Sequence, residues 1–285
     1  MRAGINNTSA HAKVQNYKAV TLDLWETILF EKDGNDARRR MARCRNLTGI
    51  LAELGVDTSI EHVNLALDKT IEMLLTVWSE NKDLSHIDQL QSIIRVASRG
   101  TTEIREEWLQ KLSQAYVSPL FEIPPYMNPD ALQALQWLKK QNKKIGLICN
   151  TGLTPGFGLR DLLSRLGVSG YFDVMVFSDE VGIRKPDQRI FHFAARKLKV
   201  KPSETVHIGD NLKSDVWGAQ SAGFRAIHLS GTEGHDKLAE KDPKSMQVVS
   251  RNLGNLKGKR TVPDRTISRL AMLAKAIGEI EDKTA

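Results

Sequence analysis

The fold is decided by Val181-Gly-Ile-Arg-Lys-Pro-Asp187 and by His207-Ile-Gly-Asp-Asn211, with Asp215 downstream. The first stretch follows an apolar run at 173–177, and the second completes one at 205–209. Short apolar runs of this kind predict buried strands. Both stretches therefore place charged side chains at or beyond the carboxyl end of a strand, which is where parallel sheets bind ligands.

Strands and helices alternate along most of the chain. We expect strands at 18–24, 144–149, 173–177, 205–209, 225–229 and 247–250. Helices are expected between them at 130–141, 159–166, 188–198 and 213–222. This alternation predicts an α/β fold, a Rossmann-like parallel sheet with helices on both faces.

An all-helical insertion interrupts the alternation near its start. From about residue 36 to residue 115 apolar residues recur at helical spacing, and no strand pattern intervenes. Trp78 and Trp108 have apolar neighbours at this spacing, so we expect them in the core of the insertion. The predicted domains are an α/β core at 17–29 and 119–256, an all-helical domain at 30–118, and a C-terminal basic segment with a helix at 257–285.

The composition is that of a globular protein. The chain has 285 residues, of which 41% are hydrophobic and 26% charged, and its formal net charge is +7. No apolar run approaches the roughly 18 residues of a membrane span. The polar N-terminus lacks an apolar signal region, and two cysteines cannot form a disulfide framework. We therefore expect a cytoplasmic monomer or homodimer with no membrane partner.

The C-terminal segment is basic. Residues 251–269 contain six Lys or Arg side chains against Asp264. No aromatic residue stands between them to stack on bases, so we do not expect a nucleic-acid partner. The helix expected at 264–281 should pack on the core or on a second subunit through an apolar stripe made of Ile267, Leu270, Leu273, Ala274 and Ile277.

A second basic cluster lies at the start of the insertion. It comprises Arg38, Arg39, Arg40, Arg43 and Arg45. We expect most of these side chains to be solvated. One that faced a binding site would clamp a carboxylate or a second phosphate of the substrate.

Four polar segments come at the carboxyl ends of expected strands. They are residues 23–27, 149–152, 184–187 and 209–215. Because the ends of parallel strands meet at one edge of the sheet, the four segments should converge on one crevice. Clustered carboxylates favour a hard cation such as Mg²⁺, and a carboxylate beside a lysine and a metal is suited to act as a covalent nucleophile.

This set of segments resembles the haloacid dehalogenase (HAD)-like hydrolase superfamily over about residues 18–256. The resemblance is most specific at 181–187 with Ile190-Phe191, and at 207–215 with Gly218-Ala219. The helical insertion is similar to the C1-type cap of subfamily I. The resemblance implies a Mg²⁺-dependent phosphatase that acts on a small phosphorylated metabolite through an aspartyl-phosphate intermediate.

The resemblance also implies roles for individual residues. Asp23 would be the nucleophile, Thr27 would brace the loop that carries it, and Lys185 would neutralise Asp23 and the bound oxyanion. The metal would be held by Asp23, the backbone carbonyl of Trp25, Asp210 and Asp215.

Two residues depart from the pattern of the family's phosphatases. Trp25 stands where those enzymes have the aspartate that protonates the leaving group. We therefore expect Trp25 to line the substrate site and alkyl phosphates to react slowly. Cys149, next to Asn150, falls where the family places an oxyanion-binding Ser or Thr, and a thiol is a weaker donor than a hydroxyl.

Two other functions stay open. The superfamily's 2-haloacid dehalogenases also carry an aromatic residue two places after the nucleophile, and they need neither a general acid nor a metal. Three carboxylates without a cation would repel one another, so the presence of both Asp210 and Asp215 favours phosphate chemistry. The other alternative is a catalytically weak binding protein of the same fold, which Trp25 and Cys149 favour and the intact Lys185 opposes.

Overall fold

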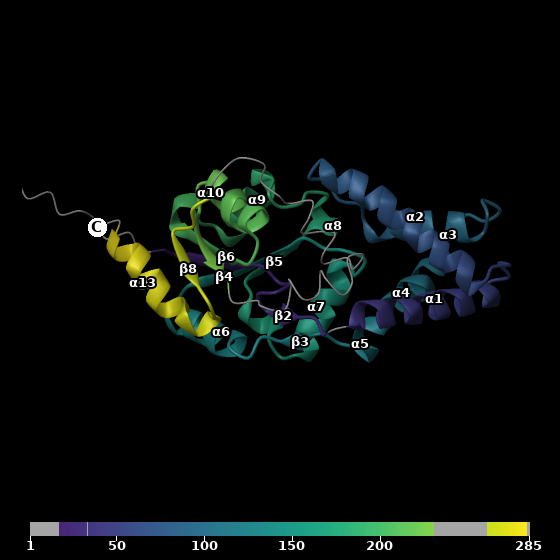
Figure 1. Cartoon of the computed structure of the whole chain (residues 1–285), viewed down its shortest axis with the longest axis horizontal. Helices are drawn as coiled ribbons and strands as arrows, with labels where there is room; N and C mark the ends of the chain where they lie inside the picture. The colour runs from purple at the N-terminus through teal and green to yellow at the C-terminus, as the bar shows by residue number, and fades with distance from the viewer. Residues whose placement is uncertain (1–16, 33, 231–260, 284–285) are drawn as a thin grey trace, which may run out of the picture.

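The computed structural model describes residues 17–32, 34–230 and 261–283, and a parallel sheet lies at its centre (Figure 1). Across the sheet the strands are β5 (Val174–Phe177), β4 (Lys144–Cys149), β1 (Ala19–Leu22), β6 (Thr205–Gly209), β7 (Arg225–Leu229) and β8 (Arg265–Ile267). All neighbouring strands are parallel. The predicted α/β fold is confirmed, and β1 lies between β4 and β6, so their carboxyl ends adjoin.

Helices cover both faces of the sheet. On one face lie α6 (Ala131–Lys140), α7 (Gly156–Arg165) and α13 (Leu273–Lys283), and on the other lie α9 (Gln188–Leu198) and α10 (Gly218–Ser221). In β4, Ile145 and Leu147 pack with the first group, whereas Ile148 packs with the second. Because successive side chains of a strand point to opposite faces, an apolar strand needs a helical layer on each side.

The C-terminal segment differs from its expected form. The sequence predicts a helix from residue 264, whereas Arg265–Ile267 forms the edge strand β8 and α13 begins at Leu273. The Asp264 backbone N donates to the Ala226 carbonyl (2.9 Å), and Ala226 N donates to the Asp264 carboxylate (2.8 Å), which aligns the segment with β7. The described part of 257–285 therefore belongs to the α/β core rather than standing apart from it.

The apolar stripe of this segment packs on the core, one of the two predicted outcomes. Its buried members are Ile267, Leu270, Leu273, Ala276, Ile277 and Ile280, whereas the predicted member Ala274 is exposed. The late start of the helix, after a strand, changes which residues share its buried face.

Some expectations fall outside the described residues. These are the strand predicted at 247–250 and the basic residues between 251 and 260. Within the described part, Arg265 pairs with Glu279 (2.7 Å) and Arg269 pairs with Asp130 (2.6 Å). In the described ranges, no helix is long and apolar enough to cross a membrane.

The helical insertion lies beside the sheet (Figure 1). Its helices are α1 (Asn35–Glu53), α2 (Ile60–Ser79), α3 (His86–Ala97), α4 (Leu109–Val117) and α5 (Pro119–Glu122). They enclose a hydrophobic core in which Trp78 and Trp108 are buried, as predicted. The chain enters and leaves through β2 (Leu29–Phe30) and β3 (Tyr126–Met127), which pair antiparallel. Strands of two residues are too short to produce a periodic pattern, so the sequence did not predict them.

The insertion is joined to the core at a second place. The loop between α2 and α3 runs antiparallel to residues 182–184. Arg184 N donates to the Asn81 carbonyl (2.9 Å), and Asp83 N donates to the Gly182 carbonyl (3.2 Å). Because Arg184 precedes Lys185, the insertion contacts the loop that delivers Lys185 to the carboxyl edge of the sheet.

Candidate active site

A cavity lies between the carboxyl edge of the sheet and the helical insertion. The predicted site residues that line it are Asp23, Trp25, Asn150, Lys185, Asp210 and Asp215, and the insertion contributes Asp36, Arg39, Arg43, Trp78 and Asn81. Thr27 and Cys149, which were also predicted for the site, do not line the cavity. The expected convergence of strand ends on one crevice therefore holds for most of the predicted residues.

Three charged side chains, Asp23, Lys185 and Asp215, form the floor of the cavity. Lys185 Nζ donates to Asp23 Oδ1 (2.5 Å), to Asp215 Oδ1 (2.6 Å) and to the Ile148 carbonyl (2.7 Å). All three charged residues are buried. The ammonium lies between two carboxylates and offsets their mutual repulsion.

Burial and charge shift the pKa values of the floor in different directions. Burial raises the pKa of Asp23 to about 6, against the attraction of Lys185. Burial acts in the same sense on Asp215, but Lys185 and His207 outweigh it and hold the pKa of Asp215 well below its usual value. Burial disfavours the charged form of Lys185, yet Asp215 and Asp23 outweigh it and raise the pKa of Lys185 above its usual value. At neutral pH the floor therefore holds two carboxylates and one ammonium.

The local sequence explains how Asp215 reaches the floor. A β-carbon added at Gly209 would lie 2.4 Å from Cγ of Asp215, so a side chain at this position would displace the carboxylate. His207 Nε2 lies 3.2 Å from Asp215 Oδ1, and Asn211 N donates to Asp215 Oδ2 (3.0 Å). The Asn211 side chain also caps the helical turn that carries Asp215.

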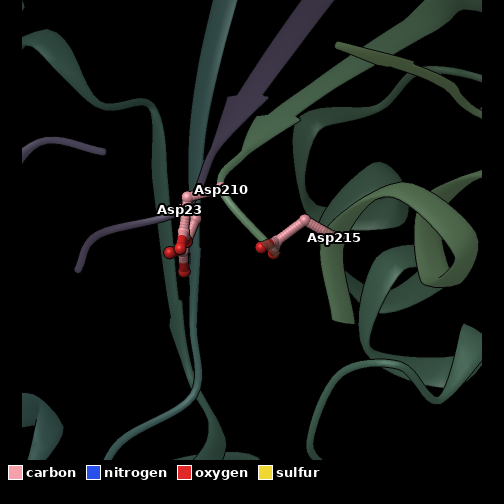
Figure 2. Close-up of side chains that lie close together, drawn as sticks. All are labelled: Asp23, Asp210 and Asp215. Atoms are coloured by element: carbon pink, nitrogen blue, oxygen red, sulfur yellow. The ribbon is translucent and has the colours of Figure 1, made fainter. Parts of the chain in front are cut away.

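Three carboxylates offer a site for a divalent cation. Asp23, Asp210 and Asp215 each have an oxygen atom within 4.8 Å of those of the other two. In Figure 2 the Asp215 carboxylate is directed from its helix toward those of Asp23 and Asp210, which come from the ends of neighbouring strands. Oxygen ligands of this kind suit Mg²⁺. The donor set therefore fits magnesium, and Trp25, the fourth predicted ligand through its carbonyl, lines the same cavity.

The side chains of Asn150 and Cys149 are both engaged in contacts within the protein. The Asn150 Nδ2 donates to the Lys185 carbonyl (2.9 Å), and its Oδ1 accepts from Lys185 N (2.8 Å), so this amide fixes the Lys185 backbone. Cys149 is fully buried in the sheet core, and its burial raises the pKa of the thiol well above the usual value. Cys149 therefore ends β4 as expected, but its side chain points into the core rather than lining the cavity.

Thr27 is also fully buried. Its carbonyl accepts a hydrogen bond from Asn128 Nδ2 (2.8 Å), which ties the loop after β1 to the segment after β3. Within the part of the chain that the structure describes, its hydroxyl has no hydrogen-bond partner. Thr27 is therefore close to the loop that carries Asp23 without reaching the cavity.

Sequence reasoning missed Asp83, which joins the insertion to the core. Its buried carboxylate accepts hydrogen bonds from Arg184 (2.6 Å), Ser178 Oγ (2.5 Å) and Trp78 Nε1 (2.7 Å). The Arg184 guanidinium carbon lies 4.0 Å from the centre of the Trp78 ring. Asp83 lies in a loop where neither spacing nor periodicity marks it, so only the folded arrangement reveals this contact.

Two arginines of the basic cluster face the cavity. The sequence predicts most of the cluster to be solvated, and Arg38 and Arg45 are exposed. Arg39 and Arg43 are instead buried and line the cavity. They lie one turn apart on α1, so they share a face of the helix.

Comparison with known proteins identifies similar chains. Residues 17–223 match a family model described as haloacid dehalogenase-like hydrolase. The chain is 37% identical over 216 residues to a glyceraldehyde 3-phosphate phosphatase of Methanopyrus kandleri, which covers 74% of this chain and 83% of that protein. It is 32% identical over 131 residues to a ribulose-1,5-bisphosphate 5-phosphatase of Halopiger xanaduensis, covering 46% of this chain and 53% of that protein.

A solved structure extends the likeness to the fold. A 2-haloacid dehalogenase from Pseudomonas syringae pv. Tomato has a TM-score of 0.60 and 23% identity, and the match covers 92% of this chain and 99% of that chain. At this identity the likeness concerns the fold alone.

Proposed function

Because the chain belongs to the haloacid dehalogenase-like hydrolase family and is a hydrolase of phosphate esters, we propose that it is a Mg²⁺-dependent phosphatase of a small phosphorylated metabolite. The observation that carries this proposal is the contact of Lys185 with both Asp23 and Asp215, beside the carboxylate of Asp210. A third carboxylate adds repulsion to the floor unless a cation neutralises it, which favours phosphate chemistry.

In the proposed reaction the Asp23 carboxylate attacks the phosphorus atom, and the leaving-group oxygen departs with the electron pair of the broken P–O bond. Lys185 holds Asp23 in place and offsets the charge of the phosphoryl oxygens. The Asn150 side chain holds the Lys185 backbone in place through two hydrogen bonds. Thr27 would brace the loop that carries Asp23. Water then cleaves the aspartyl-phosphate, which releases phosphate and restores the Asp23 carboxylate.

Magnesium, when bound, would supply positive charge to the phosphoryl oxygens and align them for attack. Asp23, Asp210 and Asp215 offer the ligand oxygens, with the Trp25 carbonyl as the fourth. The hydrogen bonds that Asp215 accepts from Lys185 and Asn211 N hold its carboxylate in a fixed orientation.

Trp25 restricts the leaving group. An indole has no titrating proton near neutral pH, so the leaving oxygen must depart unprotonated. Acyl, enol and aryl phosphates tolerate this, whereas alkyl phosphates should react roughly 10²- to 10⁴-fold more slowly than they would with a general acid. We expect Trp25→Asp to raise kcat/KM for ethyl phosphate more than for p-nitrophenyl phosphate, and an equal effect on both would contradict this role.

We further infer that residues 30–118 form a cap of the C1 type that closes over the cavity and selects the substrate. The support for this role is that Arg39 and Arg43 of the insertion line the cavity. The pairing of Asn81 with Arg184 also connects movement of the cap to the Lys185 loop.

Hydrolysis of p-nitrophenyl phosphate and acetyl phosphate, with and without Mg²⁺, tests the proposal. We expect turnover that requires the metal, and a loss of roughly 10³-fold or more in Asp23→Asn. Asp161→Asn is the matched control, because Asp161 is exposed on α7 and pairs with Arg165 (3.1 Å). It should retain full activity. Turnover of the phosphates that is independent of Asp23 would contradict the mechanism.

Trp25 also favours a second candidate, a 2-haloacid dehalogenase-type hydrolase, because an aromatic side chain lines the cavity at this position. Metal-independent halide release from 2-chloropropionate, together with no turnover of either phosphate, would replace the phosphatase proposal. No turnover in any assay would indicate a catalytically weak protein of the same fold.

A further inference from the structure

The wall that the insertion contributes to the cavity contains a buried cation, Arg43, that has no carboxylate partner among the residues the structure describes. Arg43 on α1 is 3% exposed and lines the cavity. Its Nε donates to the Tyr116 carbonyl (2.9 Å), and its guanidinium carbon lies 4.3 Å from the centre of the Tyr116 ring. Among the described residues, no carboxylate lies within ion-pair distance of Arg43, and its two terminal NH₂ groups have no acceptor.

Arg39, one turn earlier on the same face of α1, provides an internal comparison. Its guanidinium pairs with Glu31, lies 3.7 Å from Asp36 and donates to the Ile123 carbonyl (3.0 Å). Asp36 attracts Arg43 as well, but from beyond ion-pair distance. A buried charge without a partner costs much more free energy than a paired one. The two arginines therefore differ in that Arg39 is satisfied by the protein and Arg43 is not.

The guanidinium of Arg43 is fixed and charged. Burial lowers the pKa of Arg43 from its usual value, but an arginine remains protonated near neutral pH. The stacking on Tyr116 and the hydrogen bond from Nε hold the plane of the group, so its terminal NH₂ groups keep one orientation. Such a planar fork matches the two oxygen atoms of a carboxylate or a phosphate.

Resting on the proposed phosphatase function, we propose that Arg43 binds a second oxyanion of the substrate while Lys185 and the carboxylate cluster hold the reacting phosphoryl group. The substrate class is a small phosphate ester or anhydride whose other end carries a carboxylate or a second phosphate. Arg43 thereby determines specificity from the cap, and the floor performs chemistry that is independent of that end.

Three compounds that differ only at one end test this role: 3-hydroxypropyl phosphate, 3-(phosphonooxy)propanoate and propane-1,3-diyl bisphosphate. Their inhibition constants are measured against p-nitrophenyl phosphate hydrolysis. We expect the wild type to bind at least one of the compounds with two anionic ends roughly 10²- to 10³-fold more tightly than the neutral-ended one. The tighter of the two identifies the second group as a carboxylate or a phosphate.

Two variants of Arg43 and one matched control complete the test. Arg43→Gln should remove the preference for an anionic end, and Arg43→Lys should keep part of it, because an ammonium retains the charge without the fork. Arg40→Gln is the control, because Arg40 pairs with Asp68 (2.8 Å) outside the cavity and should preserve the preference. Thermal melting identifies any variant that does not fold, in which case the other Arg43 variant carries the comparison.

Equal inhibition by the three compounds in the wild type would overturn this role of Arg43. A preference that survives in both folded Arg43 variants would overturn it as well. Failure of the phosphatase proposal would appear separately, as wild-type protein that does not hydrolyse p-nitrophenyl phosphate. Calorimetric titration of the same three compounds would then measure the preference directly.

Discussion

Buried charge is paired differently on the floor of the cavity and on the wall that the helical insertion contributes. On the floor, Lys185 lies 2.5 Å from Asp23 and 2.6 Å from Asp215, so each charge has a partner before any substrate arrives. On the wall that the helical insertion contributes, Arg43 is equally buried, donates to a backbone carbonyl and lies over an aromatic ring, and it has no carboxylate partner among the described residues. Within the described part of the chain, the protein thus neutralises its own charges where we propose the chemistry, and Arg43 has no ion-pair partner where we propose recognition.

This difference separates two kinds of preorganisation. A balanced floor holds its nucleophile in one position and charge state, which suits a step common to many substrates. An unpaired cation on the wall gains a partner only when a complementary anion binds, so it discriminates among substrates. The four predictions that follow test this division, from the largest expected effect to the smallest.

Lys185→Met should have the largest effect, because it leaves Asp23 and Asp215 facing each other without a cation. We expect turnover of p-nitrophenyl phosphate to fall by roughly 10²- to 10³-fold. The free energy of unfolding in urea should fall by roughly 3–5 kcal/mol without Mg²⁺, and by less when Mg²⁺ is present. The control is Lys140→Met at an exposed position of α6. A free energy of unfolding within about 1 kcal/mol of the wild-type value would show that Lys185 does not offset the repulsion between Asp23 and Asp215.

Asp83→Ala tests the buried ion pair that joins the helical insertion to the core. The change leaves the buried Arg184 without its carboxylate and removes the acceptor of the Ser178 and Trp78 hydrogen bonds. We expect the free energy of unfolding to fall by about 3 kcal/mol. Asp68→Ala removes an exposed partner of Arg40 and should cost less than about 1 kcal/mol. Similar losses of unfolding free energy in both variants would show that the buried Asp83–Arg184 pair contributes no more to stability than an exposed ion pair does.

His86, at the start of α3 in the helical insertion, makes the free energy of unfolding depend on pH. Burial, with a smaller contribution from Arg43, lowers the pKa of His86 from 6.5 to about 4. The unfolded chain therefore binds a proton between these values and the folded chain does not, so stability is present above about pH 6.5 and is lost as the pH falls toward 4. The loss should be on the order of 3 kcal/mol.

The measurement is urea unfolding of the wild type and of His86→Gln across this pH range. His86→Gln should flatten the dependence. Because the charge of Arg43 contributes to the shift, Arg43→Gln should raise the folded pKa of His86 toward 6.5. The loss of stability should then be complete at a higher pH than in the wild type and should be smaller in total. If the unfolding free energies of the wild type and of His86→Gln changed identically with pH, His86 would not be the cause of the pH dependence.

Gly158→Ala should have the smallest effect. A β-carbon at Gly158 would lie 2.7 Å from Val117 Cγ1, where α7 of the core meets the end of α4. We expect the free energy of unfolding to fall by about 1–2 kcal/mol through overpacking. At Gly49, within α1, a β-carbon meets nothing within 4 Å, so Gly49→Ala should stabilise by up to about 1 kcal/mol. Equal changes in the melting temperatures of the two variants would contradict the close contact between the helical insertion and the core.

Much of the fold and the floor could be predicted from the sequence. Apolar runs such as Lys144–Cys149 identify buried strands, and the polar residues that follow them must lie at one edge of a parallel sheet. Asp23, Lys185, Asp210 and Asp215 follow this pattern, and all four line one cavity in the structure. The edge strand Arg265–Ile267 was missed, because its pairing depends on hydrogen bonds between Asp264 and Ala226, which are distant in the sequence.

The sequence alone thus determined the alternation of core strands and helices through residue 229, the helical insertion and the charged residues of the floor, because periodicity and strand ends are local properties of the chain. Only the tertiary structure decided which side chains face the cavity. Cys149 points into the core, and Asp83 of the insertion pairs with Arg184 of the core. Arg43 is buried with no carboxylate partner in the described ranges, although the sequence predicts the cluster around it to be mostly solvated. Burial and pairing depend on what packs against each residue, and that is fixed only when distant parts of the chain meet.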